Sequence, residues 1–249
     1  MSPAPAGGPL GPGAPGPGKP IQGRDVALTL AVTLGAYIAA VILGALIIQG
    51  SGPENPSATR VRIVIMMAVS FFVLFGSVYW VMIRTKGYSW SDLGVLPLDP
   101  HWRRMATVLG IAMVPATIII STFIQRQAGA DPQDLTRAIA GSGFNLLTAI
   151  TLFLYIALLQ PIAEELLFRG VLFGWLRRTQ GFLIANLICA GAFAIAHVQF
   201  VAIVATFFVG LVLGWLRERS GTVLAPILMH QVFNALTLVL TFGATALPR

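Results

Sequence analysis

The chain has 249 residues, of which 56% are hydrophobic and only 10% are charged. Ordinary soluble domains carry about 25% charged residues, so this composition excludes a typical soluble domain. In a soluble protein the formal net charge of +7 would suggest nucleic-acid binding. Here the basic residues lie at the ends of apolar runs, as membrane orientation requires, so we expect a lipid bilayer and no nucleic acid as partner.

Several apolar runs approach or exceed about 18 residues, the length at which a helix crosses a bilayer. They predict an all-α, polytopic transmembrane helical bundle in the cell (plasma) membrane. Basic residues are more numerous on one side of this layout, which predicts a cytoplasmic N-terminus. About seven spans are expected, or eight if the fourth is divided: 26–49, 62–83, 105–124, 144–176, 181–198, 200–216 and 222–242.

The chain is expected to divide into three parts. Residues 1–24 form a tail whose Pro- and Gly-rich sequence lacks the apolar side chains needed to offset ordering entropy, which predicts disorder. Residues 25–143 hold the N-terminal membrane helices, with loops expected at Ser51–Thr59 and Arg84–Arg104. Residues 144–243 hold the remaining helices.

The fourth apolar run contains no turn signal except Pro161. A helix over 144–176 would be roughly 50 Å long, which exceeds a hydrocarbon core of about 30 Å. Either the helix tilts and protrudes, or Pro161 divides it just before two adjacent glutamates, because proline removes a backbone donor and clashes with the carbonyl four residues back.

Ionisable side chains inside the predicted spans lie only in the C-terminal part: Glu164, Glu165, Arg169, His197 and His230. Each charge in a membrane helix costs about 2.5–3.5 kcal/mol on insertion scales, so a functional site is the default interpretation. Glu165 and Arg169 are four residues apart and should form an ion pair. Glu164 points about 100° away with no expected partner on its own helix, which makes it the strongest functional candidate.

These residue types are compatible with three kinds of chemistry. A glutamate and a histidine can hold and deprotonate water, while a second histidine and the Asn234 amide donate hydrogen bonds to a developing oxyanion. The same Glu164, His197 and His230 equal the ligand set of a catalytic zinc site. A proton-coupled transporter also uses buried carboxylates and histidines. The residues alone leave all three open.

The spacing of these residues resembles a known signature. Glu164-Glu165-Leu-Leu-Phe-Arg169, Phe193-Ala-Ile-Ala-His197 and His230-Gln-Val-Phe-Asn234 are similar to the three motifs of the CPBP family. That family contains type II CAAX prenyl endopeptidases and the Abi group of bacteriocin-processing or immunity proteins, including lysostaphin-resistance-protein-A-like proteins. The resemblance covers about residues 144–240 and implies a catalytic membrane domain at 144–243.

The resemblance implies an intramembrane endopeptidase that cuts a membrane-associated protein or peptide. Glu164 is the expected water-activating carboxylate with His197 as its partner, and Glu165 with Arg169 is the supporting ion pair. His230 and Asn234 are the expected oxyanion-stabilising pair. No cofactor is expected, with Zn²⁺ on Glu164, His197 and His230 as the alternative. The alternative function is a non-proteolytic transporter or a chaperone-like or immunity protein.

Overall fold

The computed structural model describes residues 18–48, 56–127, 146–197 and 200–246, and within these ranges the regular structure is helical. α1 (Gly23–Ile48) is followed by α2 (Pro56–Val78), which continues into a π-helical segment, η1 (Tyr79–Thr85). α3 is Pro100–Gln127. The fourth run is one succession of α- and π-turns: α5 (Leu146–Leu152), η2 (Phe153–Leu159), α6 (Gln160–Glu165), η3 (Leu166–Leu172) and α7 (Phe173–Gln180). α8 (Phe182–Ile195), α9 (Phe200–Ser220) and α10 (Leu224–Ala246) complete the described fold.

Six of the described helices are long and apolar enough to cross a membrane, and α8 is a shorter apolar helix of 14 residues. At 1.5 Å per residue α8 is about 21 Å long, less than the hydrocarbon thickness. The prediction of about seven helical spans is consistent with this arrangement. The protein is a multi-pass membrane protein.

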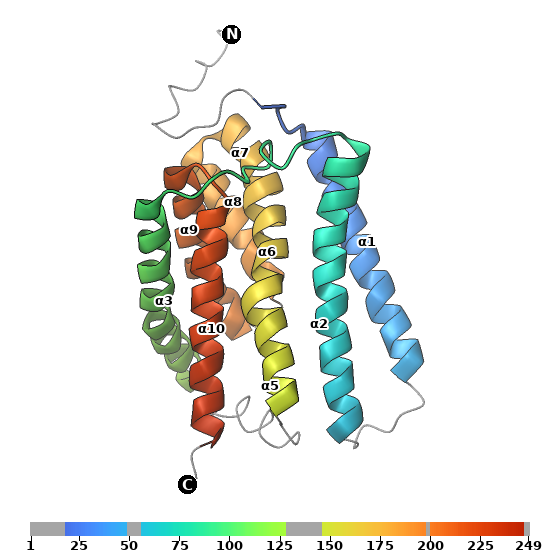
Figure 1. The fold of residues 1–249 in the computed structure, drawn as a ribbon, viewed down its shortest axis with the longest axis vertical. Coiled ribbons are helices and arrows are strands. Elements are labelled where there is room, and N and C mark those ends of the chain that lie inside the picture. The colour runs from blue at the N-terminus through green and yellow to red at the C-terminus, as the bar shows by residue number, and fades with distance from the viewer. Residues whose placement is uncertain (1–17, 49–55, 128–145, 198–199, 247–249) are drawn as a thin grey trace.

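The long helices pack side by side, and their axes run roughly along the length of the bundle (Figure 1). α10 lies against α3, η2 and α9, while α8 packs on α9, so the C-terminal helices form the densest part of the bundle. α1 contacts α2 and η1 and lies at the outer edge. We call the end of the bundle at which α1 and α3 begin, and at which α7 and α9 end, the upper end (Figure 1).

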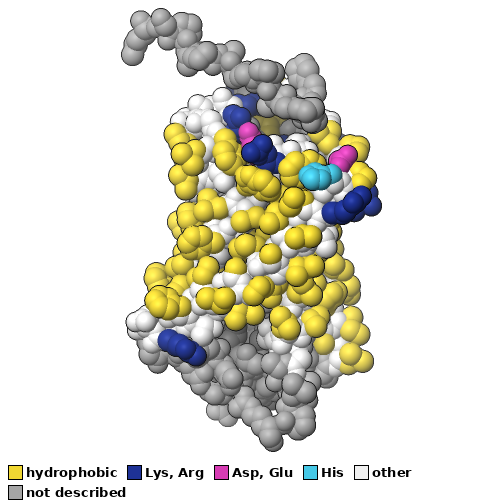
Figure 2. Space-filling view, turned by 90° about the vertical axis from the view of Figure 1, so that its left-hand side faces the viewer, with side chains coloured by type: hydrophobic (Ala, Val, Ile, Leu, Met, Phe, Trp, Pro, Cys, Tyr) yellow, Lys and Arg dark blue, Asp and Glu magenta, His cyan; other side chains and the backbone are white. Residues whose placement is uncertain are grey.

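The outer surface is that of a membrane protein. Large hydrophobic side chains on several helices are exposed, for example Leu34 at 62%, Phe72 at 65%, Ile119 at 68% and Leu183 at 67%. Figure 2 shows one face on which hydrophobic side chains cover the middle and charged residues gather toward the two ends. Because a lipid bilayer accepts such apolar surface, this band needs no protein partner to cover it.

Two predicted loops are shorter than expected, and a proline marks the start of the helix in both cases. α2 begins at Pro56, so Pro56–Thr59 is helical, while residues 51–55 lie outside the described ranges. α3 begins at Pro100, within the predicted loop Arg84–Arg104. Proline suits the first helical position because its missing N–H would have no helical partner there. The Asp99 carboxylate also accepts the His101 N–H at 2.7 Å, which caps the start of α3.

The chain just before α1 is held against the connection between η1 and α3. Within the predicted tail, residues 1–17 lie outside the described ranges, and Gly23 and Arg24 already belong to α1. The Lys19 N–H donates to Asp92 Oδ1 at 2.8 Å. The Tyr88 hydroxyl donates to Asp25 Oδ2 at 2.8 Å, and Lys86 Nζ lies 3.2 Å from Asp25 Oδ1. The upper end of α1 is thus fixed by a buried carboxylate with two partners.

Pro161 does not divide the fourth span. Helical structure is continuous through this residue, and one candidate span runs over Ala149–Gln180. The π-turns of η2 end just before the proline, and the Gln160 N–H donates to the Tyr155 carbonyl, five residues back. The same pattern would next join the N–H of residue 161 to the Ile156 carbonyl. Proline has no N–H, so this carbonyl receives no backbone hydrogen bond from residue 161.

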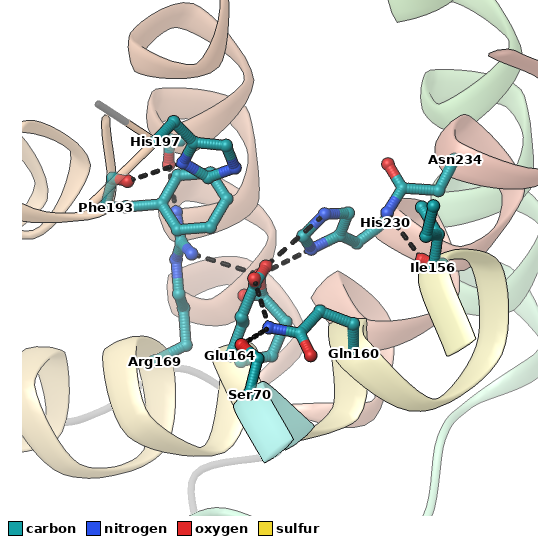
Figure 3. Close-up of polar contacts among 11 residues, drawn as sticks. Ser70, Ile156, Gln160, Glu164, Arg169, Phe193, His197, His230 and Asn234 are labelled. Carbon is teal, nitrogen blue, oxygen red and sulfur yellow. Dashed lines mark hydrogen bonds and ion pairs between the residues drawn. The ribbon is translucent and has the colours of Figure 1, made fainter. Parts of the chain in front are cut away.

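A side chain from another helix occupies the acceptor that Pro161 leaves without a donor. Asn234 Nδ2 of α10 donates to the Ile156 carbonyl oxygen at 2.9 Å (Figure 3). An unsatisfied carbonyl in hydrocarbon costs several kcal/mol, so this bond removes the main penalty of a proline in mid-membrane. The wide turn and the Asn234 amide together explain why the span remains unbroken.

Candidate functional site

A fully buried ion pair lies at the centre of the bundle. Glu165 ends α6 and Arg169 lies in η3, and both side chains are 0% exposed. Arg169 Nη1 donates to Glu165 Oε1 at 3.0 Å, as the spacing of four residues predicts. Arg169 Nη2 donates to the Gly210 carbonyl of α9 at 2.9 Å, and the guanidinium carbon lies 4.6 Å from the centre of the Phe193 ring. The pair therefore ties η3 to α8 and α9.

His230 connects this ion pair to the second glutamate. Its Nδ1 lies 3.0 Å from Glu165 Oε1, and its Nε2 lies 3.8 Å from Glu164 Oε2. The imidazole of α10 therefore faces both neighbouring carboxylates of α6 (Figure 3). The Glu164 side chain is 14% exposed whereas that of Glu165 is 0% exposed. Of the two carboxylates, only Glu164 is accessible to a small molecule.

Glu164 has a partner on its own helix, contrary to the expectation from the sequence. Gln160 Nε2 donates to Glu164 Oε1 at 2.9 Å and lies 3.1 Å from the Ser70 hydroxyl of α2 (Figure 3). Gln160 precedes Glu164 by one helical turn, so both side chains lie on the same face. The sequence interpretation searched only for charged partners and therefore overlooked this amide.

His197 enters the site beside Phe193, at the other end of α8 from Gly181. Its Nδ1 is 2.9 Å from the Phe193 carbonyl oxygen, which leaves Nε2 without a hydrogen bond among the described residues. The Phe193 ring meets the His197 ring at a centroid distance of 4.8 Å and the His230 ring at 5.7 Å, both edge to face. The two imidazoles therefore flank one aromatic ring, and Figure 3 places both on the same side of the α6 helix as Glu164.

Asn234 lies at the margin of the cluster. Its amide is directed to the Ile156 carbonyl, away from Glu164 (Figure 3). A primary amide has two N–H groups, so one remains beyond that bond. Of the six residues predicted from the motifs, Glu164, Glu165, Arg169 and His230 are joined by direct contacts, while His197 and Asn234 adjoin them.

The alternative of a zinc ion concerns Glu164, His197 and His230. Among the described residues, no group of three His, Cys, Asp or Glu side chains is arranged so that it could hold a metal ion. Nδ1 of His230 contacts Glu165, and Nδ1 of His197 contacts a backbone carbonyl, so Nε2 is the nitrogen of each ring through which a metal ion would bind.

An apolar cleft is bounded in part by Gln160, the residue that donates to Glu164. It has a volume of about 430 Å³ and lies between α1, α2 and the fourth span. Its lining includes Ser70 and Gln160, which contact each other, and Gln160 also contacts Glu164. The lining side chains are Tyr37, Met66, Met67, Ser70, Tyr155, Ile156 and Gln160.

The sequence interpretation missed two residues of this cluster, Ser70 and Gln160. Gln160 could have been found from its position four residues before Glu164, the same spacing that identified the Glu165–Arg169 pair. Ser70 gave no such signal, because an uncharged serine in an apolar helix is common in membrane proteins. Its contact with Gln160 depends on how α2 packs against α6, which sequence periodicity does not specify.

Comparison with known proteins adds one finding. Residues 146–236 match the family model described as Type II CAAX prenyl endopeptidase Rce1-like. The matched segment runs from α5 into α10 and contains the six motif residues, whereas α1, α2 and α3 lie outside it. No curated protein and no solved structure matches the chain.

Proposed function

We propose that this chain, whose residues 146–236 match the family model of Rce1-like type II CAAX prenyl endopeptidases, uses Glu164 to activate water for peptide-bond hydrolysis. The observation that carries the proposal is the difference between the two glutamates. Glu165 is fully buried and bound to Arg169 and His230, whereas Glu164 is partly accessible and lies beside His230. One carboxylate is therefore structural and the other is free to meet water.

In the proposed reaction the Glu164 carboxylate accepts a proton from a water molecule as its oxygen attacks the carbonyl carbon of the scissile peptide bond. A tetrahedral oxyanion forms. The proton then passes from Glu164 to the amide nitrogen, the C–N bond breaks, and a carboxylate and an amine leave. No covalent intermediate with the protein is needed.

His197 is the proposed second contact of the attacking water. Its Nδ1 lies against the Phe193 carbonyl, which favours a proton on Nδ1 and an acceptor lone pair on Nε2. An Nε2 acceptor can orient one water proton while Glu164 takes the other. Phe193 fixes the plane of this imidazole through its edge-to-face contact.

His230 and Asn234 are the proposed donors to the oxyanion. Asn234 has one amide N–H beyond its bond to Ile156. For His230 to donate from Nε2, it must carry protons on both nitrogens, since Nδ1 faces the Glu165 carboxylate.

The substrate is proposed to be a membrane-associated protein or peptide, of CAAX type or a bacteriocin or other precursor. The cleft between α1, α2 and the fourth span supports this class, because its lining is mainly apolar and includes Gln160, which contacts Glu164. Entry from the bilayer would bring an anchored chain to the site without transfer through water.

The test is hydrolysis by the purified full-length protein in lipid vesicles. The substrates are a farnesylated CAAX peptide and an unprenylated membrane-anchored peptide, with products identified by mass spectrometry. We expect cleavage by wild type and a loss of at least about 100-fold in kcat for Glu164→Gln, the size of a general-base contribution.

The matched control is Glu218→Gln at the end of α9, where the carboxylate pairs with Arg177 and makes no hydrogen bond or ion pair to a motif residue among the described residues. This variant should retain wild-type kcat. Equal cleavage by wild type and Glu164→Gln would overturn the proposed role of Glu164.

A further inference from the structure

We propose that Gln160 is a positioning residue that holds the Glu164 carboxylate for reaction, and that Ser70 of α2 anchors Gln160 in turn. This inference rests on the proposed function of Glu164 as the base. It assigns work to a residue outside the three motifs, and to α2, which lies outside the family match at 146–236.

The contacts form a short chain from α2 to the carboxylate. Gln160 Nε2 is 3.1 Å from Ser70 Oγ and 2.9 Å from Glu164 Oε1. An amide nitrogen carries two protons, so it can donate one to each oxygen. The opposite amide orientation would place the Gln160 carbonyl oxygen against the carboxylate, which is unfavourable because neither oxygen can donate. The geometry therefore fixes the amide with its nitrogen toward Glu164.

This contact complements the one on the other carboxylate oxygen. Gln160 holds Oε1 of Glu164, and His230 Nε2 lies 3.8 Å from Oε2. With one oxygen fixed by a donor, the rotation of the carboxylate is restricted and Oε2 remains directed toward the imidazole cluster (Figure 3). A reacting group that is already oriented lowers the activation free energy, because no further entropy is lost to order it in the transition state.

A hydrogen bond from a neutral amide also favours the ionised form of a carboxyl group. In an apolar bundle Glu164 has no cation as close as Arg169 is to Glu165. Gln160 thus orients Glu164 through a hydrogen bond that favours an acceptor carboxylate. A merely structural contact between α2 and α6 would not do so.

The test measures the ionisation of Glu164 directly as well as activity. Dicyclohexylcarbodiimide is an apolar reagent that modifies protonated carboxyl groups in membrane proteins. Labelling of Glu164 is followed by mass spectrometry against pH in wild type, Gln160→Met and Ser70→Ala, with Glu164→Gln to identify the labelled site. Methionine is close to glutamine in shape but cannot donate a hydrogen bond.

We expect the pH midpoint of labelling to rise in Gln160→Met, because the ionised carboxyl group loses a hydrogen-bond donor. Ser70→Ala should give a smaller rise in the same direction. Gln160→Glu should give the largest rise, since two adjacent carboxyl groups oppose each other's ionisation. In hydrolysis, Gln160→Met should lower kcat by about 10- to 100-fold with KM changed less than about threefold.

The matched control is Gln231→Met. Gln231 of α10 also donates from an amide to a neighbouring helix, at 2.9 Å from the Leu158 carbonyl, but it does not contact Glu164. Its labelling midpoint and kcat should equal those of wild type. Coincident midpoints in wild type and Gln160→Met, or an equal shift in Gln231→Met, would overturn the proposal.

The two proposals fail in different ways. If no peptide is cleaved but Gln160→Met still shifts the labelling midpoint, the proposed function is wrong and the control of Glu164 by Gln160 stands. If cleavage depends on Glu164 but the midpoint and kcat of Gln160→Met are those of wild type, the positioning role is wrong. If Gln160→Met does not fold, the labelling midpoint and kcat of Ser70→Ala decide whether the positioning role stands.

Discussion

His230 and Glu165 are joined through a single nitrogen, with Nδ1 3.0 Å from Glu165 Oε1. An ionised carboxylate only accepts hydrogen bonds, so the proton between them belongs to Nδ1. That assignment directs Nε2 toward Glu164 Oε2, 3.8 Å away. The buried ion pair of Glu165 and Arg169 therefore does more than join helices, because it also determines which face of His230 the accessible glutamate meets.

Removal of Glu165 should be strongly destabilising. Glu165→Ala leaves the Arg169 cation buried without its carboxylate and removes the partner of His230. We expect a loss of about 3–5 kcal/mol in the free energy of unfolding, the range for breaking one side of a buried pair. Denaturant unfolding in detergent micelles measures it. Glu218→Ala, whose partner Arg177 is 35% exposed, should lose less than about 1 kcal/mol. Equal losses of stability in Glu165→Ala and Glu218→Ala would contradict the expectation that the buried pair contributes more than the exposed one.

Gly110 of α3 should not tolerate even one added methyl group. A Cβ there would lie 2.7 Å from the Met229 carbonyl oxygen and 2.9 Å from Val232 Cβ, both on α10. Gly110→Ala should therefore displace α10 beside His230 and cost about 1–3 kcal/mol in stability, with reduced hydrolysis. Gly191→Ala in α8, where a Cβ would meet no atom within 4 Å, should be neutral or slightly stabilising. Melting temperatures of the two alanine variants compare the two positions. A melting temperature of Gly110→Ala equal to that of wild type would refute the close packing of α3 against α10.

The Asp92 carboxylate should make stability depend on acidic pH. Burial raises the pKa of Asp92, but hydrogen bonds from the backbone and side chain of Ser89 and from the Lys19 N–H outweigh it, so the pKa is lowered. A lowered folded-state pKa gives stability that is present above the ordinary value of 3.8 and is lost as pH falls below it through the folded-state value. Melting temperatures of wild type and Asp92→Asn should therefore converge as pH falls below about 4. A constant difference from pH 7 to pH 3 would argue against this linkage.

The Tyr88 hydroxyl should contribute to the attachment of α1. Burial and the hydrogen bond to Asp25 raise the pKa of Tyr88, so the hydroxyl remains a donor at neutral pH. Tyr88→Phe removes one partner of the Asp25 carboxylate, which is 4% exposed, and should lower stability by about 1–3 kcal/mol. Hydrogen exchange of the first turns of α1 is the most local measurement. Faster exchange there, with α10 unchanged, is the expected pattern; uniform exchange in both helices would indicate a global effect instead.

Chelation tests the metal alternative. The proposed reaction uses Glu164 and histidines without a metal, so hydrolysis should be undiminished after exhaustive dialysis against a strong chelator. If activity is lost and is restored by added Zn²⁺, then Glu164, His197 and His230 become the candidate ligands and would have to move together from their present positions. Metal content of the active protein, measured by mass spectrometry, provides an independent readout.

The membrane spans could be predicted from the sequence because lipid imposes a simple requirement, a sufficient length of apolar helix. The Glu165–Arg169 contact was equally predictable, since it lies within one helix at fixed spacing. The start of α2 was not, although Pro56 supplied a signal that was read as part of a loop. The contacts of Ser70 and of Asp25 depend on packing between helices distant in sequence, and the spacing within each helix does not contain that information.

The Glu164 environment shows a second reason for error. Charge and motif spacing identified Glu164, Glu165, Arg169 and the Asn234 amide, whereas the amide of Gln160 was overlooked. In hydrocarbon an amide is as consequential as a charge for the groups it contacts, because water is not there to replace it. The neutral polar residues of the fourth and last spans therefore carry more of the site than their types suggest.

The pairing of Asn234 with the carbonyl left by Pro161 also has an evolutionary consequence. An alanine at position 161 would supply its own N–H to Ile156 and compete with the Asn234 amide for that oxygen. A nonpolar residue at position 234 would leave the Ile156 carbonyl without a hydrogen bond only while position 161 is proline. Positions 161, in α6, and 234, in α10, should therefore covary among relatives. The double substitution should lower the free energy of unfolding by less than the sum of the two single substitutions.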